Sequence, residues 1–255
     1  LSSAEKYMRN STAVQNMRGM CQIALGNLSE ARRIFEKILT QYPNDVSARF
    51  GMAELDLFSG RISAAEGKYA EALERDPSNR KALLSLAFVS LERGNAAAAS
   101  RYMAEALRYH SGEAEVHYMN AKLSAMRGNL AGAERAVRTA VEINGRYDKA
   151  YELLASILYS QKKYADAIDV SDFRTARSRN ASGAWYLKGL SQYRMGNTAE
   201  AIATWTTGLS VDPFDEVMRA ALELEINKTV PIEDARRAEW SKWHIKNAAE
   251  CMKRF

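Results

Sequence analysis

The sequence predicts an all-α protein, a solenoid of helix-turn-helix repeats, from two spacings and from the helical periodicity between them. The first spacing, of 34 residues, places glycine at Gly26, Gly60, Gly94, Gly128 and Gly196, with Lys162 at the one position of the series that is not glycine. The second places alanine five residues later in all six repeats, at Ala31, Ala65, Ala99, Ala133, Ala167 and Ala201. A fixed period of this length is typical of stacked repeats that bury their apolar faces against one another.

Each repeat is predicted to contain two helices joined at the glycine, which accepts the left-handed backbone conformation that ends a helix. Seven residues before it, a small residue allows the second helix to approach closely, at Gly19, Ala53, Ala87, Ala121, Ala155 and Gly189. The recurring alanine does the same from the second helix. Pro43, Pro77 and Pro213 mark the ends of second helices, because proline cannot continue a helix.

This register divides the chain into six repeats, at 12–45, 46–79, 80–113, 114–147, 148–181 and 182–215. Residues 1–11 are interpreted as the end of a preceding repeat or as an N-terminal cap, and 216–226 as an additional helix. We expect residues 1–226 to form a single array. In the additional helix, Val217, Ala220, Ala221 and Leu224 share one side.

Residues 227–255 are predicted to form a C-terminal amphipathic capping helix that starts at Pro231. Its apolar sector contains Trp240, His244, Ile245, Met252 and Phe255. The terminal repeat of a solenoid needs covering, so we expect this sector to pack against the array. The alternative is that the sector forms an interface with another chain.

The composition argues against two classes of function. The net charge of +5 is interspersed along the chain and leaves no basic tail, which disfavours dedicated nucleic-acid binding. No apolar run approaches the ~18 residues of a membrane-spanning helix. The two cysteines, Cys21 and Cys251, are expected to be mostly buried side chains.

Over residues 12–215 the chain resembles the tetratricopeptide repeat family. That family has a small residue at position 8 of each repeat, Gly near 15, Ala at 20, an aromatic at 24, Ala at 27 and Pro at 32. Repeat two matches completely, with Ala53, Gly60, Ala65, Tyr69, Ala72 and Pro77. Repeat five instead has Lys162, Ser171 and Arg174 at positions 15, 24 and 27. The resemblance implies a right-handed superhelix, in which we expect repeat five to pack more weakly.

No arrangement of residues indicates catalysis, a metal site or a cofactor. The segment from Gly60 to Lys68 matches a phosphate-binding loop only faintly and lies in a helix-turn-helix without a preceding strand. His110 and His117 could meet beside Glu113, but two histidines without a third soft ligand make a poor metal site. We therefore expect a protein that is not an enzyme.

The resemblance also implies a binding surface, because positions 2, 5, 9, 12 and 13 of each first helix line the concave groove of the family. Transferred to this chain, the lining comprises Met20, Phe50, Glu54, Leu57, Phe58, Phe88, Tyr118, Lys122, Met126, Tyr159, Tyr186, Leu190, Tyr193 and Arg194. Leu84 and Leu91 belong either to this lining or to the packing between helices. The family's carboxylate clamp needs Lys at position 5 and Asn at position 9, and this chain has neither.

The sequence therefore predicts a scaffold or adaptor that binds a partner protein, or an apolar or helical peptide, in its groove. One alternative is an oligomer whose final helices cover the grooves of neighbouring subunits. Another is the regulatory portion of a larger enzyme or assembly. The sequence is compatible with the bacterial cytoplasm and with the cell envelope.

Overall fold

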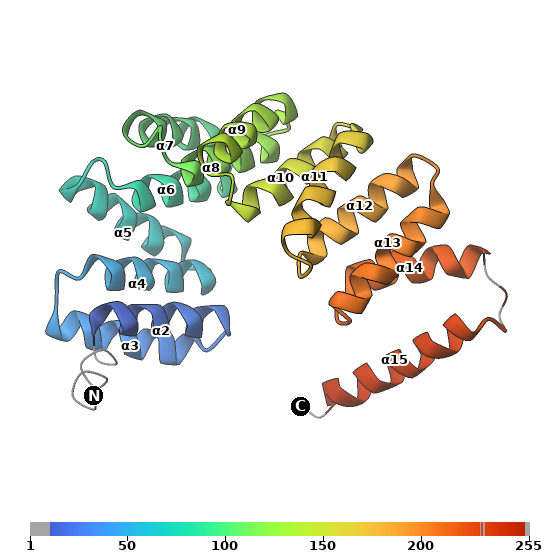
Figure 1. The fold of residues 1–255 in the computed structure, drawn as a ribbon. Helices are drawn as coiled ribbons and strands as arrows, with labels where there is room; N and C mark the ends of the chain where they lie inside the picture. Colours follow the sequence, from blue (N-terminus) through green and yellow to red (C-terminus); the bar gives the residue numbers. More distant parts are fainter. Residues whose placement is uncertain (1–10, 230, 232, 253–255) are drawn as a thin grey trace, which may run out of the picture. The chain divides into compact units, whose positions relative to one another are not determined.

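The computed structural model describes residues 11–229, 231 and 233–252, and within them it contains fourteen α-helices and no strand. The all-α prediction is confirmed. The first helices of the repeats are α2 (Thr12–Ala24), α4 (Val46–Phe58), α6 (Arg80–Glu92), α8 (Ala114–Met126), α10 (Asp148–Ser160) and α12 (Ser182–Arg194). The second helices are α3 (Leu28–Gln41), α5 (Ile62–Arg75), α7 (Ala96–Tyr109), α9 (Leu130–Ile143), α11 (Tyr164–Arg177) and α13 (Thr198–Val211). Figure 1 shows these pairs, followed by α14 (Glu216–Thr229) and α15 (Ala235–Met252).

The turns between paired helices have the predicted left-handed conformation. The five turn glycines have φ between +72° and +88°, and Lys162 adopts φ of +63° at the same position. Two of the six helices that follow these turns start with an asparagine side chain that accepts a backbone N–H, Asn95 from Ala98 and Asn129 from Gly132, both at 3.0 Å. The left-handed turn residue thus ends the first helix of each pair, and the second helix starts a few residues later.

Small residues let the two helices of a pair approach closely, as predicted. The Phe35 ring of α3 lies against Gly19 of α2 in its own pair and against Gly51 of α4 in the next repeat, and a Cβ atom on either glycine would overlap it. Trp205 of α13 packs against Gly189 of α12 in the same way. Because glycine has no side chain, a large ring fits between the helices and is fully buried. Burying a large side chain contributes about 1.5–3 kcal/mol to stability.

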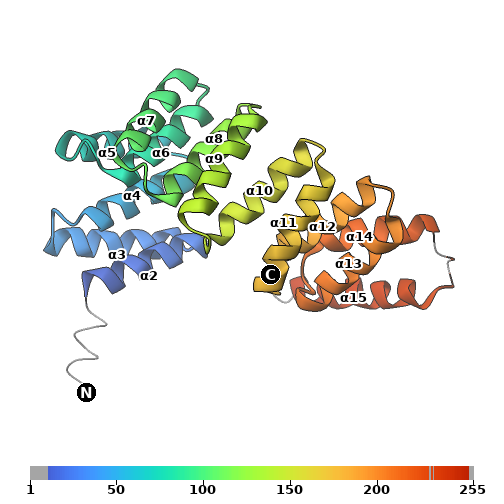
Figure 2. The ribbon, with the colours of Figure 1, turned by 45° about the horizontal axis from the view of Figure 1, so that its top comes forward.

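The chain forms two compact units, residues 1–123 and 124–255, which are considered separately below. In the first unit the core is a series of small clusters, centred on Phe35, on Tyr69 and on Leu83. In the second unit Trp205 and Met218 belong to one such cluster. Figure 2 shows the helix pairs of both units from a second direction. The predicted preceding repeat at 1–11 lies, apart from residue 11, outside the described residues.

Helix α14 turns a different side inward from the one that its sequence suggested. The structure buries Met218, Leu222 and Ile226, whereas Val217 and Leu224 are 61% and 59% exposed. The reason lies in α13, where Gly208 leaves room for the Met218 side chain. This contact places α14 against α13 as the first helix of a further repeat would lie.

Helix α15 starts at Ala235, four residues later than the predicted start at Pro231. Asp234 accepts hydrogen bonds from the backbone N–H and the guanidinium of Arg236, at 2.9 and 2.8 Å. These contacts, the side-chain hydrogen bond first, lower the pKa of Asp234 to about 2. An anionic carboxylate next to the first turn stabilises the start of a helix.

The packing of α15 onto α14 involves its tryptophans and a histidine. Trp240 is half-buried against the cluster of Trp205 and Met218, and His244 Nε2 lies 3.0 Å from Glu223 Oε2. Trp243, which the predicted sector omitted, lies 3.8 Å from the guanidinium of Arg219, measured to the ring centroid.

Four other residues of the sequence prediction are placed differently or lie beyond the description. Ile245 is 71% exposed and takes no part in the packing of α15 onto α14. The side chains of Met252 and Phe255 lie outside the described residues. Cys21 was expected to be buried and is exposed on α2. Among the helices described, none is long and apolar enough to cross a membrane.

Candidate functional site

A hollow of about 760 Å³ in the first unit is lined by the first helices of repeats two to four, α4, α6 and α8. Five of its residues were assigned to the groove from sequence, Glu54, Leu57, Phe58, Phe88 and Lys122, and a sixth, Leu84, was assigned either to the groove or to helix packing. Five were not: Arg80, Lys81, Ser85, Glu115 and Met119. Lys81 and Glu115 occupy position 2 of their repeats, so a strict use of the groove positions would have included them. The other three lie at positions 1 and 6, outside that rule.

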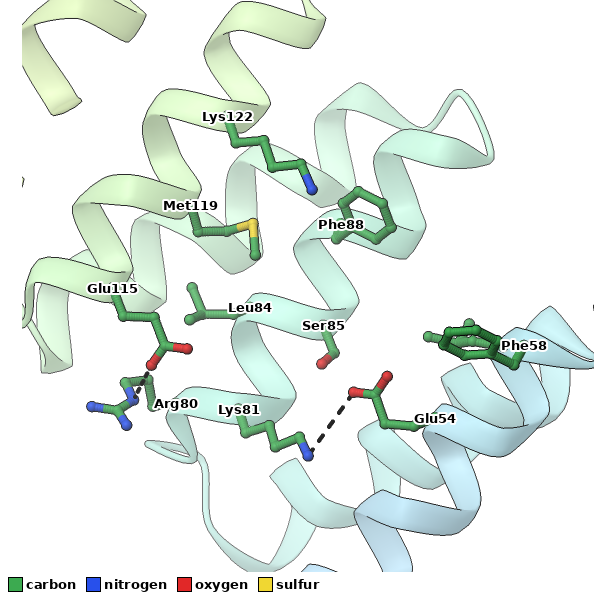
Figure 3. Close-up of a pocket in the computed structure, with 11 residues that line it drawn as sticks. Glu54, Phe58, Arg80, Lys81, Leu84, Ser85, Phe88, Glu115, Met119 and Lys122 are labelled. Atoms are coloured by element: carbon green, nitrogen blue, oxygen red, sulfur yellow. Dashed lines mark ion pairs between the residues drawn. The ribbon is translucent and has the colours of Figure 1, made fainter. Parts of the chain in front are cut away.

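The floor of the hollow is apolar and its rim carries an exposed aromatic ring. Leu84 is buried, Leu57, Phe88 and Met119 are half-buried, and Phe58 is 63% exposed. Figure 3 shows Leu84, Met119 and Phe88 from α6 and α8 on one side and Phe58 from α4 on the other. Contiguous exposed apolar surface on a folded protein is a mark of an interaction site.

Charged side chains surround this apolar floor, and most of them are paired. Lys81 Nζ lies 3.9 Å from Glu54 Oε1, and Arg80 Nε lies 3.3 Å from Glu115 Oε2 (Figure 3). Glu54 also accepts a hydrogen bond of 3.3 Å from the buried Tyr69 hydroxyl. Burial raises the pKa of Tyr69, and the neighbouring Glu54 charge adds to that rise, so the phenol remains a donor.

Lys122 differs from these residues. In the described part of the chain it forms no ion pair, and its Nζ lies 4.9 Å from the centroid of the Phe88 ring. Figure 3 shows the side chain of Lys122 extending from α8 toward that ring. An ammonium at this distance over an aromatic face is held by a cation–π interaction of about 0.5–1 kcal/mol at an exposed site.

Phe50 was predicted to line the groove, but the structure places it in the core. It is 6% exposed and stacks on Tyr69, with 5.7 Å between the ring centroids. Its edge borders a second cavity, of about 520 Å³, between α3, α4 and α5. Arg49 and Arg75 at that cavity both contact Glu71 at 2.8 Å, so each guanidinium already has a carboxylate partner.

The remaining groove residues of the first unit are Met20 and Tyr118, which the hollow does not include. Met20 is 37% exposed on α2, and Tyr118 is half-buried on α8. The side chains of His110 and His117 both contact backbone oxygens. His110 Nε2 lies 2.5 Å from the carbonyl oxygen of Ser78, and His117 Nε2 lies 2.8 Å from that of Ser111.

In the second unit the predicted groove residues form pairs rich in tyrosine. Arg194 Nε donates a hydrogen bond of 2.9 Å to the Tyr159 hydroxyl. Tyr193 lies 6.3 Å from Trp205 between ring centroids. The other three are Tyr186 and Leu190, which pack against the cluster of Trp205 and Met218, and Met126, which is 46% exposed.

Comparison with known proteins identifies the repeats. Models described as tetratricopeptide repeat match residues 22–67, 59–123, 118–172 and 184–207. No curated protein sequence matches the chain.

Solved structures share the fold at low sequence identity. A tetratricopeptide repeat protein from Parabacteroides merdae is 20% identical over 88% of this chain and 89% of its own, with a TM-score of 0.63. PilW, described as a type IV pilus biogenesis factor, is 17% identical over 83% and 98%, with a TM-score of 0.67. YrrB, described as having an unusual peptide-binding site, is 19% identical over 73% and 96%, with a TM-score of 0.54. With the repeat models, the 34-residue register and the paired helices in agreement, the chain belongs to the tetratricopeptide repeat family.

Proposed function

We propose that this protein is a non-catalytic scaffold that holds a segment of a partner protein in the hollow between α4, α6 and α8. The observation that carries the proposal is the exposed Phe58 ring beside an apolar floor of Leu84, Phe88 and Met119. Covering one such ring is worth roughly 1.5–3 kcal/mol, which gives a partner segment an anchor.

The chemistry of the hollow favours a protein segment over a nucleic acid. Its lining carries both signs of charge, since Glu54 and Glu115 stand among the cations. A phosphate backbone would meet these carboxylates, whereas a peptide with apolar side chains meets the floor. The description of the structurally similar YrrB as a peptide-binding protein agrees with this proposal.

A second candidate function is self-association, which an apolar stripe on the second unit favours. Phe214, Val217 and Leu224 are 65%, 61% and 59% exposed at and along α14. A second copy of the chain could cover this stripe. This alternative predicts a mass that rises with protein concentration and that Phe214→Ala returns to the monomer value.

Two equally exposed phenylalanines provide the test, because Phe58 lines the hollow and Phe214 does not. Short random peptides displayed on phage are selected against the wild type, and the affinities of the selected peptides are measured by calorimetry. Phe58→Ala is expected to weaken binding by about tenfold or more, while Phe214→Ala leaves it unchanged. Neither ring is buried, so both variants should keep the circular dichroism spectrum and melting temperature of the wild type. The proposal fails if no peptide is selected or if Phe58→Ala binds as tightly as the wild type.

A further inference from the structure

The unpaired Lys122 indicates what the partner segment carries, an inference that rests on the function proposed above. The ammonium of Lys122 lies over Phe88 in the hollow, and the described residues offer it no carboxylate. Its neighbours differ in this respect, because Arg80 contacts Glu113 at 3.0 Å and Glu115 at 3.3 Å. Lys122 is therefore the cation of the hollow that is free to meet an anion from outside.

Covering Phe88 also removes water from Lys122, since the two side chains are in contact. Desolvating a charged group without a partner is costly, and a charge-assisted hydrogen bond offsets that cost. A purely apolar segment would gain the ring contact and lose the hydration of the ammonium. A segment with an anion beside its apolar side chain would gain the contact with the Phe88 ring and would also replace the lost hydration of the Lys122 ammonium by an ion pair.

The charge balance of the hollow limits that anion to a single negative charge. Of the three cations in its lining, Arg80 is paired with Glu113 and Glu115 and Lys81 with Glu54, which leaves only the single positive charge of Lys122 without a partner among the described residues. A carboxylate supplies one negative charge, whereas a phosphorylated residue supplies about 1.5–2. The nearby glutamates would repel the excess charge of a phosphate.

We infer that the hollow recognises a protein segment in which an apolar side chain, placed on Phe88, is accompanied by an aspartate or glutamate side chain that pairs with Lys122. The site differs from the carboxylate clamp, whose residues this sequence lacks, because its unpaired cation, Lys122, lies at position 9 of repeat four. The acidic residue would act as a selective contact, while the apolar residue would supply most of the affinity.

The test is a double-mutant cycle on the peptides selected against the wild type. Each acidic residue of a peptide is replaced by its amide, and affinities are measured for wild type, Lys122→Met and Lys122→Glu. We expect the amide to bind the wild type roughly three- to tenfold more weakly and to bind Lys122→Met as well as the acid does. Lys122→Glu should select peptides with Lys or Arg in place of the acid. Lys37→Glu, the same charge change on an exposed residue of α3, is the control and should alter none of these preferences.

The outcomes separate this inference from the function on which it rests. If Phe58→Ala weakens binding but the peptides show no acidic preference, or the acid and amide differ equally on wild type and Lys122→Met, the inference is wrong and the function stands. If amidation of the peptide C-terminus removes the preference, the anion is a terminal carboxylate and the assignment to a side chain is overturned. If Phe58→Ala has no effect, both proposals fail.

Discussion

Repeats two and five have the same register and helix lengths but different chemistry in their second helices. Helices α5 and α11 each contain 14 residues, and their starts at 62 and 164 are separated by a multiple of the repeat length. Repeat two has Tyr69 and Ala72 on the inner face of α5, whereas repeat five has Ser171 and Arg174. Repeat five keeps the helix register although Lys162, Ser171 and Arg174 replace the residues typical of the family, because the buried Ala167 and the left-handed turn are retained.

The two repeats differ in how well their buried groups are satisfied. Tyr69 is fully buried, and its hydroxyl donates a hydrogen bond to Glu54. Arg174 is 8% exposed, and its Nε and Nη1 atoms have no hydrogen-bond partner in the described structure. Its Nη2 atom lies 3.5 Å from Asp148 and 3.4 Å from Glu152. Buried polar groups without partners reduce stability, so repeat five should be the weaker of the two.

The largest effect should come from giving repeat two the residue of repeat five. Tyr69→Ser removes a fully buried ring and leaves a cavity, and it should lower the free energy of unfolding by about 3–5 kcal/mol. Urea denaturation followed by circular dichroism measures this change. A loss below about 1 kcal/mol would show that the aromatic position is not a main contributor to the packing of this repeat.

Replacing the buried arginine of repeat five should have a smaller effect of the opposite sign. Arg174→Met keeps similar volume and removes two unsatisfied donors, while Asp148 and Glu152 are more than 40% exposed and remain hydrated. We expect an increase of roughly 1–2 kcal/mol in the free energy of unfolding. Destabilisation by Arg174→Met would mean that the contacts with Asp148 and Glu152 outweigh the buried donors.

The repeats should also differ in their response to acid. Repeat two buries Asp56 at position 11, where repeat five has Leu158. Burial opposes the ionisation of Asp56, but hydrogen bonds from Lys68 at 2.5 Å and Arg61 at 2.9 Å outweigh it and hold its pKa below the usual value. A lowered folded-state pKa contributes stability that is complete above the ordinary value of about 3.9 and is lost as the pH falls below it.

The prediction is therefore a loss of stability below about pH 4 that depends on Asp56. Melting temperatures measured between pH 7 and pH 2.5 should fall less steeply for Asp56→Asn than for the wild type. Asp169→Asn, at an exposed residue of α11, controls for the general effect of removing a carboxylate. Parallel curves for Asp56→Asn and the wild type would contradict the assignment.

The smallest expected effect concerns the turns. Lys162 adopts φ of +63°, which costs a residue with a Cβ about 1–2 kcal/mol, whereas glycine pays mainly in entropy. Lys162→Gly should raise the free energy of unfolding by about 0.5–1 kcal/mol, and Gly60→Lys should lower it by a similar amount. Thermal melts of the two variants and the wild type measure both changes in stability. Changes of the same sign in the two variants would refute a common conformational cause.

The sequence predicted the helix register because its signals are local. A turn glycine or a small residue at position 8 imposes its geometry on the nearest helix, whatever the rest of the chain does. The rotation of each first helix about its axis depends on neighbours and was predicted less well. Phe50 is buried because Tyr69 stacks on it, and Val217 is exposed because Gly208 admits Met218 instead. Lys122 was assigned to the groove from its position in the repeat. That it has no ion pair could be seen only once the structure showed which side chains of α4, α6 and α8 lie around it.

The central claim is that a partner segment binds in the hollow, and hydrogen exchange tests it most directly. Mass spectrometry would compare backbone exchange of the protein with and without a peptide selected against it. We predict slower exchange in α4, α6 and α8, at residues 46–58, 80–92 and 114–126. Protection confined to α3 and α5, beside the second cavity, or to α14 and α15, would contradict the claim and move the binding site elsewhere.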